Sequence, residues 1–96
     1  MDIQSVKIQI IPILKRHHVK RASLFGSIVT GKIHENSDID ILVELPKDHS
    51  LMDRAGLKVE LEDQLRRTID VINYTGIKEH TKKSILASQI LIYHET

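Results

Sequence analysis

The segment from Asp38 to Leu45 constrains the fold more than any other part of the sequence. Isoleucine or valine stands at every second position as far as Val43, acidic residues stand at most of the positions between, and the segment stops at Pro46. This period of two is typical of a β-strand with one buried face and one polar face. The alternation therefore predicts a strand that carries Asp38, Asp40 and Glu44 together on one side.

The rest of the chain divides into short elements around this strand. Two further stretches have the composition of strands: 21–25 and 68–73. Four stretches have the apolar spacing or the turn residues of helices: 3–17, 27–30, 51–67 and 77–94. Helices and strands thus alternate along the chain, beginning and ending with a helix, which predicts an α/β fold.

Four local features refine the predicted helices. Pro12 lies inside the first helix and is expected to kink or split it. Ser50 and Asp53 have the spacing of a capping box at the start of the third helix. The apolar residues of that helix cover a wide arc, so burial on more than one side is expected. In the last helix the apolar residues between Ile85 and Tyr93 point all round. This pattern fits either a partner or a second copy of the chain against the helix, or a frayed helix end with ordinary surface isoleucine and leucine residues.

Length and composition indicate one folded domain over residues 1–96, with 41% hydrophobic and 28% charged residues. A net charge of +1 and only three aromatic residues argue against a nucleic-acid-binding module. The absence of cysteine excludes a disulfide framework, and the first 13 residues are too polar for a signal peptide or a membrane span. We therefore expect a cytoplasmic protein with no membrane segment.

Asp38 and Asp40 are the first candidate metal ligands. Two positions apart on a strand, their side chains leave the same face about 7 Å apart, at ~3.3 Å per residue. Like charges so placed repel unless a cation neutralises them, and carboxylate oxygens suit Mg²⁺ or Mn²⁺. An Asp-x-Asp sequence nevertheless arises by chance in about a third of chains this long, so an exposed acidic strand face is the alternative.

Gly26 and Ser27 form the second candidate site, at a predicted strand-to-helix junction. Backbone N–H groups at a helix start, together with a hydroxyl group, can bind an anion, and glycine lets a phosphate approach the backbone. Alone, a Gly-Ser pair is more often a simple turn. Combined, Gly26-Ser27 and Asp38-x-Asp40 are separated by ten residues, an arrangement expected by chance in only about one or two chains per thousand.

This arrangement, Gly-Ser-x10-Asp-x-Asp, resembles that of the polymerase-β-like nucleotidyltransferases. The flanking residues 24–27 and 37–43 look like those of the minimal nucleotidyltransferases, a prokaryotic group often paired with a HEPN-domain protein. The resemblance is close from Val19 to Leu45 and holds in outline elsewhere. It implies the nucleotidyltransferase fold, in which helices flank a small mixed sheet of about three strands.

The same resemblance implies a two-metal reaction with ATP as substrate. Asp38 and Asp40 would hold two Mg²⁺ ions. Asp70, on the strand predicted at 68–73, would be the third catalytic carboxylate, which ligates one of these ions and helps to activate the attacking hydroxyl group. Sequence spacing does not settle Asp70, which could instead be an ordinary residue of a short edge strand. Gly26 and Ser27 would hold the β- and γ-phosphates while a nucleoside monophosphate is transferred and pyrophosphate is released.

The chain departs from the family pattern at two positions. The family commonly has arginine one and three positions after the serine, where this chain has Ile28 and Thr30. Two potential contacts to the triphosphate are therefore missing. Lys32 could supply one nucleotide-binding charge, although an exposed surface lysine explains it equally well.

Two functions follow as hypotheses. Family members often act as antitoxins that transfer AMP to a tyrosine of a HEPN toxin, so the first is adenylylation of a partner protein. The last helix and the apolar arc of 51–65 would be docking surfaces, and a homo-oligomer through the C-terminal helix is also considered. The second is a binding module without catalytic activity, which neutralises its partner by contact. A zinc site among the six histidines, a serine hydrolase and an oligonucleotide polymerase are disfavoured.

Overall fold

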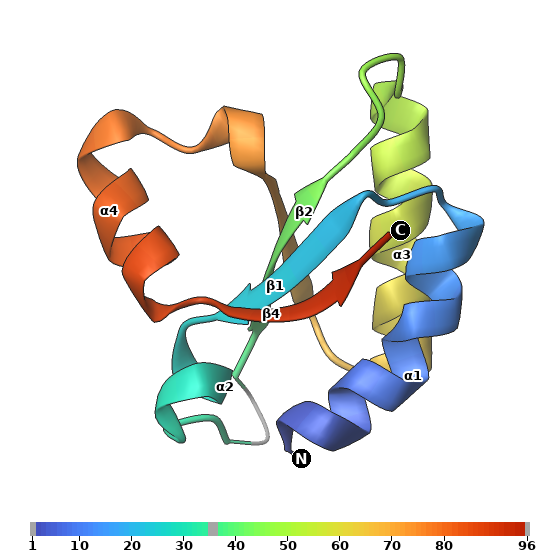
Figure 1. Ribbon diagram of the computed structural model, residues 1–96. Helices are drawn as coiled ribbons and strands as arrows, with labels where there is room; N and C mark the ends of the chain where they lie inside the picture. Colours follow the sequence, from blue (N-terminus) through green and yellow to red (C-terminus); the bar gives the residue numbers. More distant parts are fainter. Residues whose placement is uncertain (1, 35–36, 96) are drawn as a thin grey trace.

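A four-stranded sheet runs through the centre of the computed structural model, which describes residues 2–34 and 37–95 (Figure 1). Its strands, in chain order, are β1 (Arg21–Phe25), β2 (Ile39–Glu44), β3 (Ile69–Asn73) and β4 (Ile90–His94). They lie side by side in the order β3-β2-β1-β4. β1 is antiparallel to β2 and β4, whereas β2 and β3 are parallel. The sheet is thus mixed, and it has one strand more than the sequence predicted.

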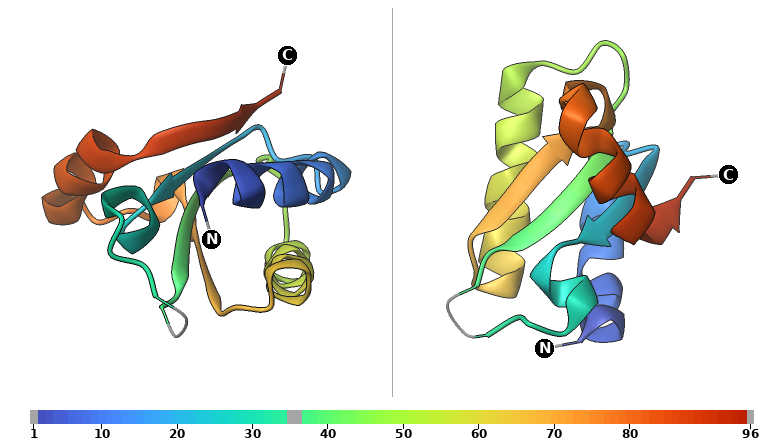
Figure 2. Two further views of the ribbon diagram at one scale, coloured as in Figure 1. Left: turned by 90° about the horizontal axis from the view of Figure 1, so that it is seen from below. Right: turned by 90° about the vertical axis from the view of Figure 1, so that its left-hand side faces the viewer.

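The helices lie on opposite sides of this sheet. α1 (Ile3–Arg16) and α3 (Leu51–Leu65) cover one face, whereas α4 (Glu79–Ser88) stands on the other side (Figures 1 and 2). The single turn α2 (Ser27–Thr30) connects β1 to β2 along the chain. The short helix η1 (Tyr74–Gly76) follows β3 and contacts β2. None of the helices formed by the described residues is long and apolar enough to cross a membrane.

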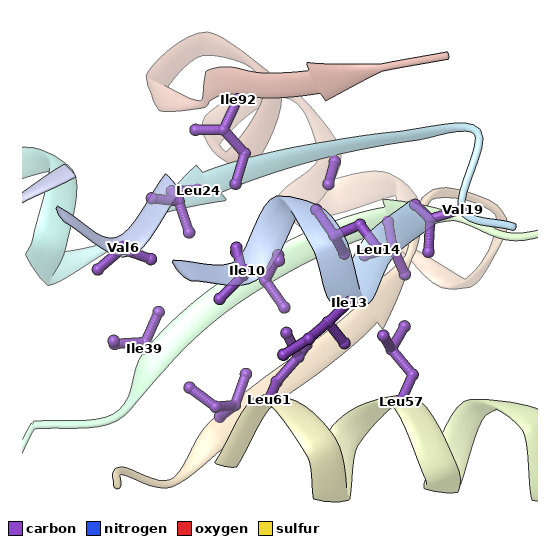
Figure 3. Close-up of a cluster of buried hydrophobic side chains, with 14 of the residues drawn as sticks. Val6, Ile10, Ile13, Leu14, Val19, Leu24, Ile39, Leu57, Leu61 and Ile92 are labelled. Atoms are coloured by element: carbon purple, nitrogen blue, oxygen red, sulfur yellow. The ribbon is translucent and has the colours of Figure 1, made fainter. Parts of the chain in front are cut away.

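The hydrophobic core lies between the sheet and the pair α1 and α3 (Figure 3). Its members are aliphatic, as the scarcity of aromatic residues requires. Most are almost completely buried, and burial of each such side chain stabilises the fold by roughly 1.5–3 kcal/mol. The contributors from α1 and α3 recur at helical spacing, and they are Val6, Ile10, Ile13 and Leu14 of α1 and Leu57, Leu61 and Leu65 of α3.

Of the two outcomes expected at Pro12, a kink or a split of the first helix, the split does not occur, because α1 continues from Ile3 to Arg16 with the proline inside it. Proline removes the hydrogen bond to the carbonyl group four residues earlier, which belongs to Ile8. Ile8 is 72% exposed and Pro12 is also exposed, so this carbonyl group lies on the solvent side of the helix. Water can therefore replace the missing donor, and the buried side of α1 remains intact.

The third helix has the capping box that Ser50 and Asp53 predicted. Its expected burial on several sides is wrong, because only Leu57, Leu61 and Leu65 are buried. Three other large apolar residues of α3 are exposed, namely Leu51, Met52 and Val59. With α1 and the sheet packed on a single side, α3 needs only the narrow stripe of residues spaced four apart.

The predicted helix at 77–94 is also wrong in its second half. The helix α4 ends at Ser88, and 90–94 forms the strand β4 along the open edge of β1. A short run of isoleucine, leucine and tyrosine is compatible with either structure, and the free edge of β1 decides in favour of a strand. The C-terminal helix through which we considered a homo-oligomer therefore does not include these residues. Ile90 and Leu91 remain exposed on β4.

Candidate active site

Two strands bring the predicted carboxylates to one end of the sheet. In the parallel ladder of β2 and β3, Asp40 lies directly beside Asp70. Asp38 immediately precedes β2, and its side chain is exposed, as is that of Asp70, whereas Asp40 is half-buried. The structure therefore brings Asp70 to the predicted pair, which sequence spacing could not establish.

The electrostatics of Asp40 show how close these carboxylates are. The pKa of Asp40 is raised to about 6, first by burial, then by the negative charge of Asp70 and a hydrogen bond with it, and last by the charge of Asp38. A hydrogen bond between two carboxyl groups requires a proton on one of them. Near neutral pH the three groups therefore repel one another, and the site favours a cation that relieves this repulsion.

Gly26, directly after the neighbouring strand β1, brings its backbone against the same carboxylates. Asp40 pairs with Phe25 across the antiparallel ladder of β1 and β2, so Gly26 follows directly beside it. Gly26 has a φ of 80°, and a Cβ atom added there would collide with Oδ2 of Asp40. Both its conformation and its surroundings exclude a side chain. The Gly-Ser turn and the carboxylates therefore form one continuous site.

The turn after Gly26 is held by backbone hydrogen bonds between residues close in the sequence. The carbonyl oxygen of Gly26 accepts hydrogen bonds from the N–H groups of Val29 and Thr30. Gly31 closes the turn in the left-handed conformation, at a φ of 77°. The turn begins at the half-buried Ser27, next to the carboxylates, where the first N–H groups of a helix lack intrahelical acceptors.

The sequence also matches a known family model, "Polymerase beta, Nucleotidyltransferase", over residues 8–96. The match takes in all four strands and the Gly-Ser and Asp-x-Asp residues. The chain belongs to this nucleotidyltransferase family. The predicted resemblance, enzyme class and nucleotidyltransferase fold are thereby confirmed, with four strands in the sheet in place of about three.

Individual relatives agree with this assignment. "Putative protein adenylyltransferase MJ0435" of Methanocaldococcus jannaschii is 49% identical over 86 residues, which is 90% of this chain and 92% of the relative. "Protein adenylyltransferase MntA" of Thermococcus cleftensis is 31% identical over 78 residues, or 81% of this chain and 79% of the relative. A solved structure described as a putative minimal nucleotidyltransferase superposes with a TM-score of 0.81 at 29% identity, covering 94% of this chain and 95% of that one.

The structure shows what Ile28 and Thr30, at the two departing positions of the turn, contact in this nucleotidyltransferase. Ile28 is buried in the hydrophobic core, so its side chain helps to hold α2 against the rest of the molecule. The side chain of Thr30 is exposed, and its hydroxyl group donates to the carbonyl oxygen of Ser27 at 3.3 Å. Neither residue presents a cation to a triphosphate. Lys32 is exposed just after the turn, where its N–H group donates to the same carbonyl oxygen at 3.0 Å.

Sequence reasoning missed the residues that hold the two acidic strands in place. Nη1 of Arg67 donates to the carbonyl oxygens of His34 and Ser37, at 2.7 and 2.9 Å, and so holds Ser37, the residue directly before Asp38. Glu62 accepts a hydrogen bond from the N–H group of Ile69 at 3.0 Å, directly before Asp70. Both interactions join residues of different elements, and no local sequence pattern signals them.

The number and type of the carboxylates can be compared with the ligands that a metal ion prefers. Among the side chains that the structure describes, no three acidic or histidine groups are arranged so that they enclose a metal ion by themselves. Magnesium does not require such a cage, because it keeps several waters and is commonly bound by one or two carboxylates together with substrate phosphates. The contact of Asp40 with Asp70, and the added charge of Asp38, therefore suit Mg²⁺ in the presence of a nucleotide.

Proposed function

We propose that this chain transfers AMP from ATP to a hydroxyl group of a partner protein, with Asp38, Asp40 and Asp70 as its catalytic carboxylates. The observation that carries the proposal is the pairing of Asp40 with Asp70 in the parallel ladder of β2 and β3, beside the backbone of Gly26. It joins a cation-demanding cluster to a turn that a phosphate can approach closely. The two relatives named as protein adenylyltransferases support the choice of AMP and of a protein acceptor.

Each residue of the site has a role in this proposal. Gly26 and Ser27 bind the β- and γ-phosphates of ATP, and Lys32 is available for one further charge contact. Mg²⁺ held by Asp38, Asp40 and Asp70 would neutralise the charge on the phosphate oxygens. The acceptor oxygen forms a bond to the α-phosphorus, the bond from that phosphorus to the β-phosphate oxygen breaks, and pyrophosphate leaves. Asp70, exposed at the edge of the site, accepts the proton of the acceptor hydroxyl.

The acceptor in this proposal is a tyrosine of a HEPN-domain protein, which the chain would inactivate as its antitoxin. The resemblance of residues 19–45 to the minimal nucleotidyltransferases motivates this choice of partner. Exposure of the catalytic carboxylates supports it as well, because Asp38 and Asp70 are open to solvent, where a large acceptor can reach them.

A second candidate function is a binding module that neutralises its partner without catalysis. The observation that favours it is the absence of a cation at positions 28 and 30, since Ile28 is a core residue and Thr30 bonds its own turn. The two candidates differ in what they require of the carboxylates. Contact alone does not need Asp38 or Asp40, whereas nucleotide transfer does.

The deciding experiment incubates the chain with its natural partner, α-labelled ATP and Mg²⁺. Wild type is compared with Asp38→Asn, Asp40→Asn and with a matched control, Asp48→Asn, Asp63→Asn, which removes two exposed carboxylates elsewhere. We expect label on the partner with wild type and with the control, and none with the active-site pair. A partner that stays unlabelled yet bound and inhibited in all three samples would establish the binding module instead.

A further inference from the structure

A cavity lies on the same face of the sheet as the carboxylates, but at the opposite end. It has a volume of about 690 Å³ and opens between the end of β2, near Glu44, and the helix α4. Glu44 lies four residues beyond Asp40 on one strand, which is about 13 Å at ~3.3 Å per residue. The cavity and the catalytic carboxylates are therefore separate sites on one face.

Hydrogen bonds across the sheet hold the wall of this cavity in place. The hydroxyl group of Tyr74 donates to Oε1 of Gln89 at 2.8 Å and lies 2.9 Å from Oγ of Ser23, which is completely buried. These bonds tie η1 and the end of α4 to β1. Tyr74 and Gln89 both line the cavity, so this wall exists before any ligand binds.

The charge of the lining is positive and largely uncompensated. Lys20, Lys47 and Lys82 line the cavity from three different segments, and no ion pair joins any of them to a carboxylate of the described residues. The acidic residue of the lining, Glu44, accepts a hydrogen bond from Nε of Arg21 at 2.7 Å. The same guanidinium lies 4.0 Å from the centre of the Tyr74 ring. Arg21 and Glu44 thus cancel each other, and the three lysines remain.

We infer that this cavity binds an organic polyphosphate, in the class of nucleoside diphosphates and triphosphates. Ammonium groups bind phosphate as point charges, and three of them around one cavity match a ligand with at least two phosphate groups. The volume lies within the range of about 300–1,000 Å³ that is usual for small-molecule sites. Apolar side chains of Leu45, Pro46 and Leu86 also line it and offer a surface for the organic part of the ligand.

The fixed wall and the volume of the cavity favour a small polyphosphate over an acidic protein segment as its ligand. A cavity with a fixed wall suits a compact ligand, whereas a protein segment needs a long exposed surface on which to lie. The site does not depend on the catalytic proposal, because it shares no lining residue with the carboxylates or with the Gly-Ser turn. A ligand held there would be an effector of the chain or a second nucleotide.

The test is a titration of the whole chain with ADP in EDTA, followed by amide NMR shifts. Without a divalent cation the carboxylates repel phosphate, so binding at the catalytic end is suppressed. We expect the amide signals of Tyr74, Thr75 and Gln89 to shift, with little change at Ser27. Adenosine without phosphate should bind at least about tenfold more weakly. Shifts confined to Ser27, or equal binding of adenosine, would overturn the proposal.

A pair of variants tests the lysines themselves. Lys47→Gln, Lys82→Gln removes two exposed charges from the lining, and Lys15→Gln, Lys83→Gln removes two exposed charges elsewhere. The first pair should weaken ADP binding about tenfold or more, and the second less than about twofold. Equal weakening by both pairs would show unspecific attraction and overturn the site. Tighter binding of an oligoglutamate peptide than of ADP would overturn it in favour of an acidic protein segment.

Discussion

The two ends of one face of the sheet carry opposite charges, and these charges are arranged differently. At one end the strand register forces Asp40 against Asp70, with Asp38 beside them, and burial of Asp40 makes the repulsion costly. At the other end Lys47 and Lys82 are exposed on flexible side chains, and the one fixed acid is already paired with Arg21. The acidic end is therefore under electrostatic strain in the protein alone, whereas the basic end is not. Only the acidic end therefore requires a ligand to relieve the repulsion between its charges.

The largest expected effect comes from the removal of a carboxylate at the acidic end. Asp40→Asn should lower kcat/KM for nucleotide transfer by about 10³-fold, because it removes a metal ligand and changes the partner of Asp70. The control Asp63→Asn lies on the exposed side of α3 and should change kcat/KM less than about twofold. Steady-state transfer of labelled AMP to the partner measures both. Retention of more than a tenth of the activity by Asp40→Asn would contradict its proposed role.

The next largest effect comes from a side chain introduced next to the carboxylates of the acidic end. Gly26→Ala should reduce the free energy of unfolding by about 3 kcal/mol, because the new Cβ collides with Asp40 and the backbone has a positive φ. Gly31→Ala keeps a positive φ but meets open space, so about 1 kcal/mol is expected, and Gly76→Ala should change little. Urea denaturation of the three variants gives the series. Equal losses at Gly26 and Gly31 would show that backbone conformation alone sets the cost.

A smaller effect tests how firmly the basic end is built. Tyr74→Phe removes the hydroxyl group that bonds Gln89 and approaches the buried Ser23, so the free energy of unfolding should fall by about 1–2 kcal/mol. Tyr93→Phe, which alters a tyrosine outside this cavity, serves as the control and should cost less. Thermal unfolding by circular dichroism measures both. A loss no greater than that of the control would mean that the cavity wall is not held by these bonds.

The smallest effect sharpens the contrast through pH. A carboxyl group whose pKa is raised in the folded state binds its proton more tightly there, so Asp40 destabilises the fold above pH 6 and has no effect well below pH 3.8. In metal-free buffer at pH 7.5, Asp40→Asn should therefore be more stable than wild type by about 1 kcal/mol, after allowance for solvent screening at this half-buried site. This corresponds to a rise in Tm of about 4–8 °C.

The same comparison at other conditions supplies its checks. The advantage of Asp40→Asn should shrink as the pH is lowered toward 4, because Asp40 of the wild type becomes protonated. It should also shrink when Mg²⁺ and a nucleotide are added, because a cation relieves the repulsion in the wild type alone. An advantage that is independent of pH would assign it to packing and not to charge.

Much of the fold was predictable because its signals are local. The alternation of β2, the strand β1, the turn closed by Gly31 and the capping box of Ser50 each depend on a few neighbouring residues, and the structure has all of them. The errors lie where burial decides. Residues 90–94 became a strand because β1 offers a free edge, and α3 buries one stripe because its neighbours lie on one side.

The candidate site divides in the same way. The spacing of Gly26-Ser27 and Asp38-x-Asp40 selected the family from the sequence, since these residues are set by a turn and a single strand. Arg67 and Glu62, which hold the acidic strands in place, had no sequence signal, because their partners lie in other elements. The assignment of catalytic roles to Asp38, Asp40, Asp70, Gly26, Ser27 and Lys32 stays a prediction.

By itself, the sequence determined the chemistry that the chain can offer and the short-range geometry of two segments, because side-chain identity and strand or turn period are local properties. Only the tertiary structure decided that Asp70 lies beside Asp40, that Ile28 belongs to the core and that three lysines surround one cavity. These arrangements join residues far apart in the chain, and strand register and helix packing, which involve the whole molecule, set which of them meet.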